Sequence, residues 1–434
     1  MKRLPPPSID PKDILSSLPQ TTESWIGYHC ELVTPLYGGG VVAGEVDKAM
    51  PIRATAIRGH LRFWWRLLNR NRFSSSSELF KAERAIWGGL GKEQELEASK
   101  VKVRIQGIAN VSPNPCANYP PGKNYPNWQP WAHPYALFPA QGRVRSGQVL
   151  EHPKKLAIKG LSFDLLISIS QRLDSSDRKS VLDAVRWWGT FGGVGARTRR
   201  GLGAVWVKSV SGMPSFQPVS ETEAQKQGMR LVLSGKTATD SIVAWKYGID
   251  KLKDFRQGVG IGRNPGSHPG RPGRSRWPEP GAIRRITGKF RVKGDGTSFQ
   301  PSQDQPILFP RAAFGLPIIF HFQNERGDRQ RDPEDVTLMA MEYQDQEPIF
   351  WERMASPIIL RPYPVDSGQW RSAALVLPVR PIKDLYLEWR ASGRRIVAPD
   401  WLPKKSSQTG AHPPVPPMAG YSDPIEAFLN FFRN

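Results

Sequence analysis

The run FGGVGARTRRGLGAV, from Phe191 to Val205, is the stretch of the chain best suited to binding an anion. Glycine adopts positive φ and has no side chain, so its N–H group can approach a phosphate closely. Arginine adds a planar, permanently charged guanidinium that can donate two hydrogen bonds to one phosphate. We therefore predict a phosphate-binding loop. Its candidate residues are Gly192, Gly193, Gly195, Arg197, Arg199, Arg200, Gly201 and Gly203.

The elements beside this loop exclude two common nucleotide-binding motifs. RKSVLDAVRWWGT predicts a helix capped by Ser176 or Ser180, and GAVWVKSV predicts a strand. The order is therefore helix, loop, strand. A Walker A loop or a dinucleotide fingerprint runs strand, loop, helix and uses the N-terminus of that helix. The alternative to a phosphate site is a long glycine-rich turn whose arginines are solvated.

A second set of arginines lies on a predicted helix in PIRATAIRGHLRFWWRLLNR, whose buried side carries Trp64 and Trp65. The arginines recur every four residues, so like charges share one stripe and repel by roughly 0.2–0.5 kcal/mol per pair unless something negative lies against them. A solvated face is the alternative. We expect alanine substitutions in this stripe to leave the free protein as stable as before. The predicted RNA contacts here are Arg53, Arg58, Arg62 and Arg66.

A third basic stretch, QGVGIGRNPGSHPGRPGRSRWPEPGAIRRITGK, interleaves arginine with glycine, proline and one tryptophan. This composition does not favour a core, but it can hold a phosphate chain or stack a base. The alternative is a disordered basic loop. The predicted RNA contacts of the second half are Arg263, Arg271, Arg274, Arg276, Trp277, Arg284, Arg285 and Arg311.

The composition of the whole chain points to a polyanionic partner. Its 434 residues carry a formal net charge of +22 and a sequence pI near 10.1. Such a charge repels itself unless nucleic acid or an acidic partner neutralises it. Arginine outnumbers lysine 38 to 23, which favours bidentate phosphate contacts and stacking on bases.

Other classes of protein are disfavoured. Cys30 and Cys116 are too few and too far apart for a zinc site or a disulfide framework. The N-terminus has no apolar signal core, and no window approaches a membrane span of about 18 apolar residues. We expect a cytoplasmic protein with no metal, no cofactor and no membrane partner.

The order of predicted elements indicates an α+β fold. Strands in SWIGYHCELVT, VKVRIQG and LSFDLLISIS, a further strand near Tyr135 to Phe138, the two helices above and the strand after the glycine loop approximate a ferredoxin-like (RRM-like) βαββαβ unit. The polar linker 211–228 suggests a boundary between domains 1–218 and 219–434. The second half begins with the strand MRLVLSGK and a helix from about Ser241 to Phe255. It ends on a helix with Asp423 as N-cap and Glu426 completing a capping box.

Residues 110–147 form a long stretch rich in proline and aromatic residues. A loop of this length is more often functional than idle. Its aromatic side chains could form a stacking platform, a docking surface for a neighbouring subunit, or simply an anchor for the loop.

These segments together resemble the RAMP proteins of CRISPR effector complexes, and within them the first RAMP subunit of the type III-B, or Cmr, complex. TPLYGGG...PIRATAIRGHLRFWWR resembles the N-terminal motif of that subunit, and FGGVGARTRRGLG resembles the RAMP glycine-rich loop. GRSRWPEPGAIRR, FPRAAFGLPIIF and RMASPIILRP resemble its second-half motifs. Most of residues 25–362 is covered. The second half has no clear second copy of the glycine loop.

The resemblance implies two ferredoxin-like domains in tandem with long loop insertions, and a place near the 3′ region of the guide RNA. It also implies binding to guide and target RNA, to other RAMP subunits and to the small subunit of the complex. The expected role in antiviral defence is non-catalytic, because target cutting belongs to a different RAMP subunit.

Two other functions are consistent with the sequence. The first is a RAMP-type endoribonuclease that cuts guide precursor or target RNA, for which Asp47 and His60 are the residues to examine. The simpler interpretation of Asp47 is a turn residue, and that of His60 is a side chain on the helix surface. The second is a generic single-strand RNA-binding or ribosome-associated protein, which the charge permits and the motifs do not favour.

Overall fold

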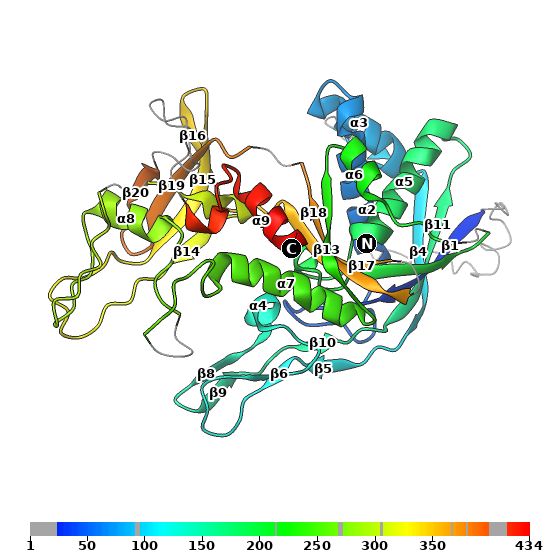
Figure 1. Cartoon of the computed structure of the whole chain (residues 1–434). Helices are drawn as coiled ribbons and strands as arrows, with labels where there is room; N and C mark the ends of the chain where they lie inside the picture. Colours follow the sequence, from blue (N-terminus) through cyan, green and yellow to red (C-terminus); the bar gives the residue numbers. More distant parts are fainter. Residues whose placement is uncertain are drawn as a thin grey trace, which may run out of the picture.

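The computed structural model describes residues 24–91, 96–212, 215–267, 272–303, 307–365, 368–378, 381–398 and 415–434. It shows a mixed α/β protein with several antiparallel sheets (Figure 1). The first half, the second half and a separate sheet inserted into the second half account for its main layers.

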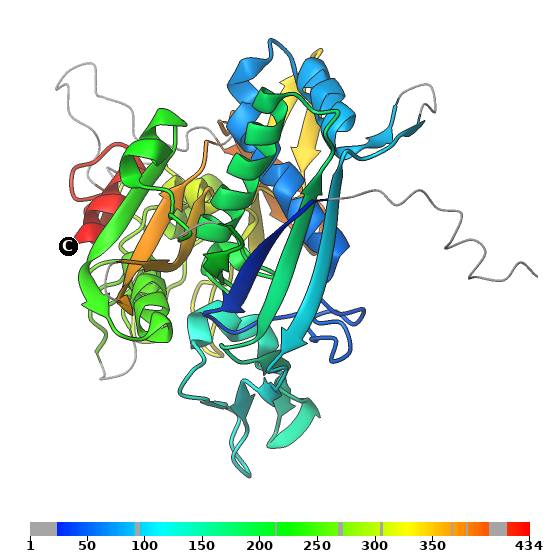
Figure 2. The ribbon, with the colours of Figure 1, turned by 90° about the vertical axis from the view of Figure 1, so that its right-hand side faces the viewer.

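The first sheet has four antiparallel strands in the order β12-β1-β11-β4, and two helices cover one face of it (Figure 2). Alternate strand residues such as Cys30, Phe163 and Leu165 face these helices and are buried. The chain order strand, helix, strand, strand, helix, strand is the predicted βαββαβ sequence. The elements are β1 (Trp25–Leu32), α2 (Ala54–Asn69), β4 (Val101–Ala109), β11 (Ser162–Ile169), α5 (Ser175–Phe191) and β12 (Val205–Val210).

Two local features of this half differ from the sequence prediction. The N-cap of α5 is Asp174, whose side chain accepts a hydrogen bond from the N–H of Asp177, and not Ser176 or Ser180. A helix that the periodicity did not predict, α3 (Ser76–Trp87), follows the serine run, and Ser75 caps it. It lies beside α2 and presents a buried carboxylate, Glu83, to the arginines there.

The region between β4 and β11 projects from the body (Figures 1 and 2). The predicted strand near Tyr135 to Phe138 is wrong, because Pro134 begins a short helix capped by the His133 side chain. His133 also reaches across to Asp250 of α7 (Ser241–Gln257), with 3.2 Å between the ring nitrogen Nε2 and a carboxylate oxygen. The elements of this projecting region are β5 (Pro113–Pro115), β6 (Ala117–Asn118), β7 (Asn127–Trp128), α4 (Pro134–Leu137), η2 (Phe138–Ala140), β8 (Arg143–Arg145), β9 (Gln148–Glu151) and β10 (Lys155–Ala157).

The second half contains a three-stranded sheet in the order β13-β18-β17. One face packs on α5 through Leu231, Ile359 and Leu375, and the other packs on α7 and α9 through Leu360 and Ala374. Within the described residues this sheet has three strands, so the second complete ferredoxin-like unit is not seen. The elements are β13 (Arg230–Ala238), α7 (Ser241–Gln257), β17 (Ile358–Pro364), β18 (Trp370–Val376) and α9 (Pro424–Arg433).

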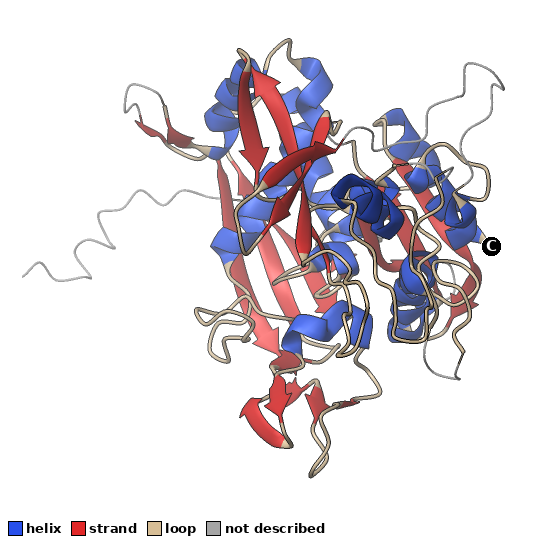
Figure 3. Cartoon of the chain, turned by 90° about the vertical axis from the view of Figure 1, so that its left-hand side faces the viewer, coloured by secondary structure: helices blue, strands red, loops and turns tan. Residues whose placement is uncertain are grey.

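A separate sheet, β14-β15-β19-β20 with β16 beside β15, is built from the two connections that surround β17 and β18 (Figure 3). It has its own core, in which Phe309 and Leu338 pack on Ile283 of α8. Its elements are α8 (Glu279–Thr287), η4 (Pro310–Phe314), β14 (Ile318–Phe320), β15 (Val336–Gln344), β16 (Glu347–Trp351), β19 (Asp384–Trp389) and β20 (Arg395–Ala398).

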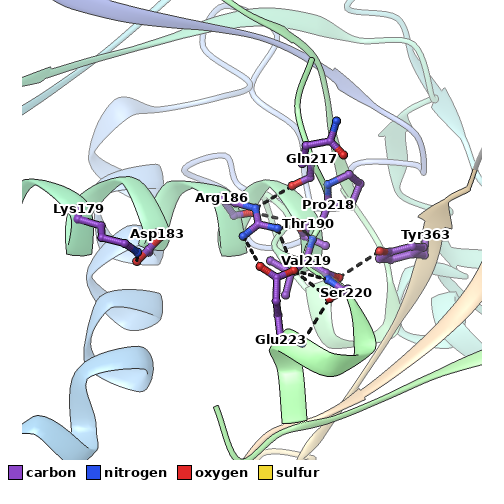
Figure 4. A network of polar contacts seen from close by, with 10 residues as sticks. All are labelled: Lys179, Asp183, Arg186, Thr190, Gln217, Pro218, Val219, Ser220, Glu223 and Tyr363. Carbon is purple, nitrogen blue, oxygen red and sulfur yellow. Dashed lines mark hydrogen bonds and ion pairs between the residues drawn. The ribbon is translucent and has the colours of Figure 1, made fainter. Parts of the chain in front are cut away.

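A polar network fixes the linker between the two halves (Figure 4). Arg186 of α5 donates to the carbonyls of Gln217 and Pro218 and to the carboxylate of Glu223. Tyr363 of β17 donates to the carbonyl of Val219. The linker is therefore a fixed part of the interface between the halves. The remaining elements are η1 (Arg70–Arg72), β2 (Gly89–Leu90), β3 (Leu96–Glu97), η3 (Thr198–Arg200), α6 (Glu221–Lys226) and η6 (Pro416–Met418).

Candidate nucleic-acid interface

The glycine loop connects α5 to β12 and packs between the two halves. Thr34 donates from its hydroxyl to the carbonyl of Gly201 at 2.6 Å and accepts from the N–H of Ala204 at 2.8 Å. Trp245 of α7 donates to the carbonyl of Arg200 at 2.7 Å. The loop is therefore bonded both to the segment that follows β1 and to the second half.

Glycine is required at two positions of this loop for steric reasons. Gly201 has φ of 73°, and a Cβ there would lie 2.5 Å from the carbonyl oxygen of Leu360. Gly203 has φ of 60°, and a Cβ there would lie 2.0 Å from the carbonyl oxygen of Val194. Positive φ and a close backbone neighbour each disfavour any larger residue. These glycines allow dense packing.

The N–H groups of the loop are largely occupied by bonds within the protein. Those of Val194, Gly201 and Gly203 donate to the carbonyls of Gly203, Thr198 and Pro35. They are not free to receive a phosphate, so the interpretation of Gly201 and Gly203 as direct anion contacts is wrong. The arginines of the loop are therefore its main candidates for holding an anion.

The arginines of the loop gather with one from α7. Arg199 and Arg200 both donate to Ser356, and Arg256 donates to the hydroxyl of Tyr135 at 3.2 Å. Burial, followed by the charge of Arg256, lowers the pKa of Arg200 to about 10. Throughout the described ranges, no carboxylate forms an ion pair with Arg199, Arg200, Arg256 or Arg197. Uncompensated like charges held together make a site for an anion.

This cluster is defined as Arg197, Arg199, Arg200 and Arg256, and two of its members line a hollow beside a large groove. A hollow of about 420 Å³ contains Arg200 and Arg256. It shares Arg256 and Ile319 with a groove of about 980 Å³ that runs over the inserted sheet. The basic residues that line the groove are Arg256, Arg263, Arg274, Arg284, Arg291, Lys293 and Arg311.

Three of these basic groups are available for a ligand. Arg263 and Arg274 donate only to backbone carbonyls, of Gly273 and Ser298, and Lys293 joins no ion pair in the described structure. Together with the cluster they give seven basic side chains that no described carboxylate neutralises. Five of the seven, Arg197, Arg199, Arg200, Arg263 and Arg274, are predicted site residues, and they come from the glycine loop and the third basic stretch.

Phenylalanine rings lie among these charges. The guanidinium of Arg274 lies 4.0 Å from the centre of the Phe299 ring, and that of Arg284 lies 5.1 Å from Phe322. Sequence reasoning missed both rings, as well as Arg256, Arg291 and Lys293. Their segments show no local pattern, and only the fold places them in one groove.

Several predicted contacts prove to be paired with carboxylates. Arg284 makes a bidentate ion pair with Asp332, at 2.6 and 2.8 Å. Arg311 pairs with Glu279, which is fully buried. Arg53 pairs with Asp47 at 3.1 Å. These ion pairs fix the local structure and leave less charge for a ligand.

The remaining predicted RNA contacts of the third basic stretch lie in different surroundings. The prediction that Trp277 stacks on a base is wrong, because its side chain is 1% exposed and its indole N–H donates to the carbonyl of Arg256. Residues Glu279–Thr287 form α8, so this stretch does contribute to a core. Arg276 donates to the carbonyl of Gly260, and Arg285 is exposed on α8. Arg271 lies outside the described residues.

The prediction of an exposed arginine stripe on α2 is also wrong. Arg62 and Arg66 each donate to the same oxygen of Glu83 at 2.6 Å, and this carboxylate is 1% exposed. Arg58 donates to the carbonyl of Trp87. The like charges of the stripe are compensated from α3, so the predicted neutrality of alanine substitutions does not hold.

The two residues considered for catalysis lie outside the groove. Asp47 accepts from the N–H groups of Met50 and Ala49 and from Arg53, and these bonds lower the pKa of its carboxyl. Burial lowers the pKa of His60. Asp47 thus has the geometry of a turn residue.

Residues 29–206 match the family model of the RAMP superfamily. This range includes most of the first sheet, both of its helices and the glycine loop, so the match covers this part of the chain. The superfamily resemblance inferred from the sequence motifs is confirmed.

The comparison with solved structures gave matches that include three of low sequence identity and with TM-scores below 0.5. The apo crystal structure of Cmr1 from Pyrococcus furiosus is 14% identical, with 86% of this chain and 94% of that chain covered and a TM-score of 0.43. A chain of the type III-B Cmr-beta complex bound to cognate target RNA is 10% identical, with 82% and 95% covered and a TM-score of 0.41. Cmr6 from Pyrococcus furiosus is 13% identical, with 43% and 98% covered and a TM-score of 0.23.

The comparison with curated proteins gave no match. Among the helices that the structure describes, none has both the length and the apolar character needed to cross a membrane.

Proposed function

We propose that this chain is a non-catalytic RNA-binding and assembly subunit of a type III-B CRISPR effector complex, which contacts the guide RNA 3′ region, the target RNA or both. The observation that carries the proposal is a set of seven basic side chains without a described carboxylate partner, in which the hollow at Arg200 and Arg256 adjoins a groove lined by Arg263, Arg274 and Lys293. Phosphate contacts of this kind bind RNA without reading its sequence.

The occupant of the groove would be single-stranded RNA or one strand of a guide–target duplex. Guanidinium groups supply bidentate phosphate contacts, and the rings of Phe299 and Phe322 offer faces beside them. Other RAMP subunits and the small subunit of the complex would be its protein partners. In this proposal residues 1–218 form the RAMP domain with the glycine loop, and residues 219–434 supply the groove.

The bonds of Asp47 support the non-catalytic role over the endoribonuclease alternative. A general base must be free to take a proton from the attacking hydroxyl. Asp47 is already bonded to Arg53 and to two backbone N–H groups. In the reconstituted complex, Asp47→Ala and His60→Ala should therefore leave the number and spacing of target cuts unchanged. Loss of one cut from an intact complex would assign that cut to this chain.

A salt titration of RNA affinity tests the proposal. The full-length chain should bind unrelated 20-nucleotide RNAs with similar affinity, and affinity should fall steeply with salt. For single strands each phosphate contact contributes about 0.7 to the slope of log K against log salt, so seven contacts predict a slope near 5. A weak slope, or strong preference for one sequence, would contradict the proposal.

A further inference from the structure

The sheet of the second half leaves one edge open. In the first sheet, β12 pairs with the outer side of β1 and completes the order β12-β1-β11-β4. The order β13-β18-β17 repeats the last three positions, with β13 in the place of β1. In the described parts of the chain, β18 is the one strand paired with β13, so the position that corresponds to β12 is unfilled.

The backbone along this edge lacks partners. The N–H of Met229 donates to the carbonyl of Ala224 at the end of α6. Beyond it, the described structure gives Arg230, Leu231 and Val232 no backbone hydrogen bonds other than those to β18. Alternating donors and acceptors at strand spacing are satisfied best by another extended polypeptide.

A groove of about 470 Å³ follows the same edge. Met229 and the first three residues of β13, Arg230 to Val232, line it, together with side chains of α6 and α9, which form its walls. Two helices beside the edge leave access for a single extended segment and hinder the approach of a whole second sheet. Figure 2 shows β13 as the outermost strand of its sheet.

The free edge of the first sheet is different. Strand β4 carries exposed Lys102 and Arg104 along its length, and charged residues on an edge strand oppose pairing with other chains. The corresponding part of β13, Leu231 to Leu233, is uncharged and mostly buried. The charged residues of β13 are Arg230, which pairs with Glu426, and Lys236, so the stretch between Leu231 and Leu233 lacks the charged side chains that β4 has.

We propose that the edge of β13 receives an extended strand from another subunit of the assembly, antiparallel to β13, in the position that β12 holds in the first sheet. The inference rests on the proposed function, because it requires that the chain works within an assembly. Main-chain hydrogen bonds would hold the strand, and the groove walls would select its side chains.

The ends of the groove carry opposite charges, which sets the preferred sequence of the strand. Glu221 of α6, the helix that leads into β13, lines the groove, and Arg230 at the start of β13 is already paired with Glu426 of α9. Arg433 lies at the other end, where its carbonyl oxygen would be 3.3 Å from a Cβ on Gly235. An antiparallel strand starts beside Arg433 and ends beside Glu221, so an acidic residue near its beginning and a basic residue near its end fit best.

Hydrogen–deuterium exchange of the isolated chain and of the reconstituted complex tests the proposal. Outward-facing amides of residues 230–233 should exchange quickly in the isolated chain and at least tenfold more slowly in the complex. Slow exchange in the isolated chain would show that its own residues cover the edge, and would overturn the proposal. Unchanged exchange on assembly would overturn it as well.

Variants that fill the groove give a second test. Gln225 and Asn430 are exposed on its two walls, and Gln225→Trp with Asn430→Trp should reduce incorporation into the complex at least tenfold. Lys226→Trp, on α6 outside the groove, is the matched control and should assemble normally. Normal assembly of the double variant would overturn the proposal.

The RNA affinity of the isolated double variant should equal that of the unmodified chain, which separates the two proposals. If the chain binds RNA and enters the complex while the amides of residues 230–233 still exchange quickly, the strand inference is contradicted and the proposed function stands. A chain that neither binds RNA nor assembles contradicts the proposed function, and the strand inference with it.

Discussion

The arginines of α2 and those of the glycine loop have opposite surroundings. On α2, Arg62 and Arg66 converge on Glu83, a carboxylate that α3 supplies from within the helical layer. In the loop, Arg199 and Arg200 reach only Ser356, and the described structure brings no carboxylate to them. The same residue type thus stabilises the fold in one region and remains available for an anion in the other.

The difference shows that the neighbour decides the role of an arginine. Spacing along a helix reveals which charges share a face, but it does not reveal whether another element covers that face. A buried carboxylate that has lost its partners is costly, whereas a cluster of unpaired arginines is relieved by binding phosphate. Substitutions in the two regions should therefore fail in different ways.

The largest effect is expected when the α2 arginines are removed. Arg62→Ala with Arg66→Ala leaves Glu83 buried without a counter-ion, and should lower the free energy of unfolding by about 3–5 kcal/mol. Urea denaturation measures this loss. Adding Glu83→Gln to the double variant removes the buried charge and should restore part of the stability. A stable double variant with lost RNA affinity would reverse the assignment of the two regions.

The loop arginines should affect binding and leave folding nearly unchanged. Replacing Arg197, Arg199 and Arg200 by alanine should weaken RNA binding about 100-fold and reduce the salt slope by about 2, for every RNA sequence. Fluorescence anisotropy at several salt concentrations measures both. The matched control removes three exposed basic residues away from the groove, Arg172, Lys179 and Lys226, and should change affinity far less. Equal losses would mean that overall charge alone drives binding.

A smaller loss of stability is expected from glycine substitutions. Comparing two of them separates the cost of positive φ from the cost of a steric clash. Gly201→Ala combines positive φ with a clash against Leu360, and should cost about 2 kcal/mol of stability. Gly212→Ala has a similar φ of 75° and no atom within 4 Å, so it should cost about 1 kcal/mol. Thermal melts compare the two. Equal losses would show that the close approach to the second half does not matter.

The smallest effect concerns the linker network. Hydrogen bonds from Arg186 lower the pKa of Glu223 to about 2 from its ordinary 4.5, so its contribution is present above pH 4.5 and is lost as pH falls towards 2. The pair is partly exposed, which limits the contribution to about 0.5–1 kcal/mol. Glu223→Gln should lose this amount at pH 7 and nothing near pH 2. Unfolding free energies measured against pH check the trend, with the exposed Glu347→Gln as control.

Periodicity predicted the elements of the first half well, because β1, β11, α2 and α5 each bury one face of a regular pattern. It failed for α3, where a serine run and a polar surface obscured the helix. That single omission led to the wrong interpretation of the α2 arginines, because Glu83 contacts them only in the folded chain.

The groove could be predicted only in part. Arg263, Arg274, Arg284 and Arg311 were expected to bind RNA from composition, and they do line one groove. Arg256, Lys293 and Phe299 come from separate segments with no distinctive local pattern. Trp277 was misjudged, because proline and glycine around it suggested a loop while the indole packs on Phe255 in the core.

Photo-crosslinking of a 4-thiouridine-labelled 20-nucleotide RNA to the full-length chain, with mass-spectrometric mapping, tests the central claim most directly. Crosslinks should fall on residues 197–200 and on the groove around Arg256, Arg274 and Phe299, and α2 should remain unlabelled. Crosslinks concentrated on α2, with the glycine loop and the groove unlabelled, would contradict the account.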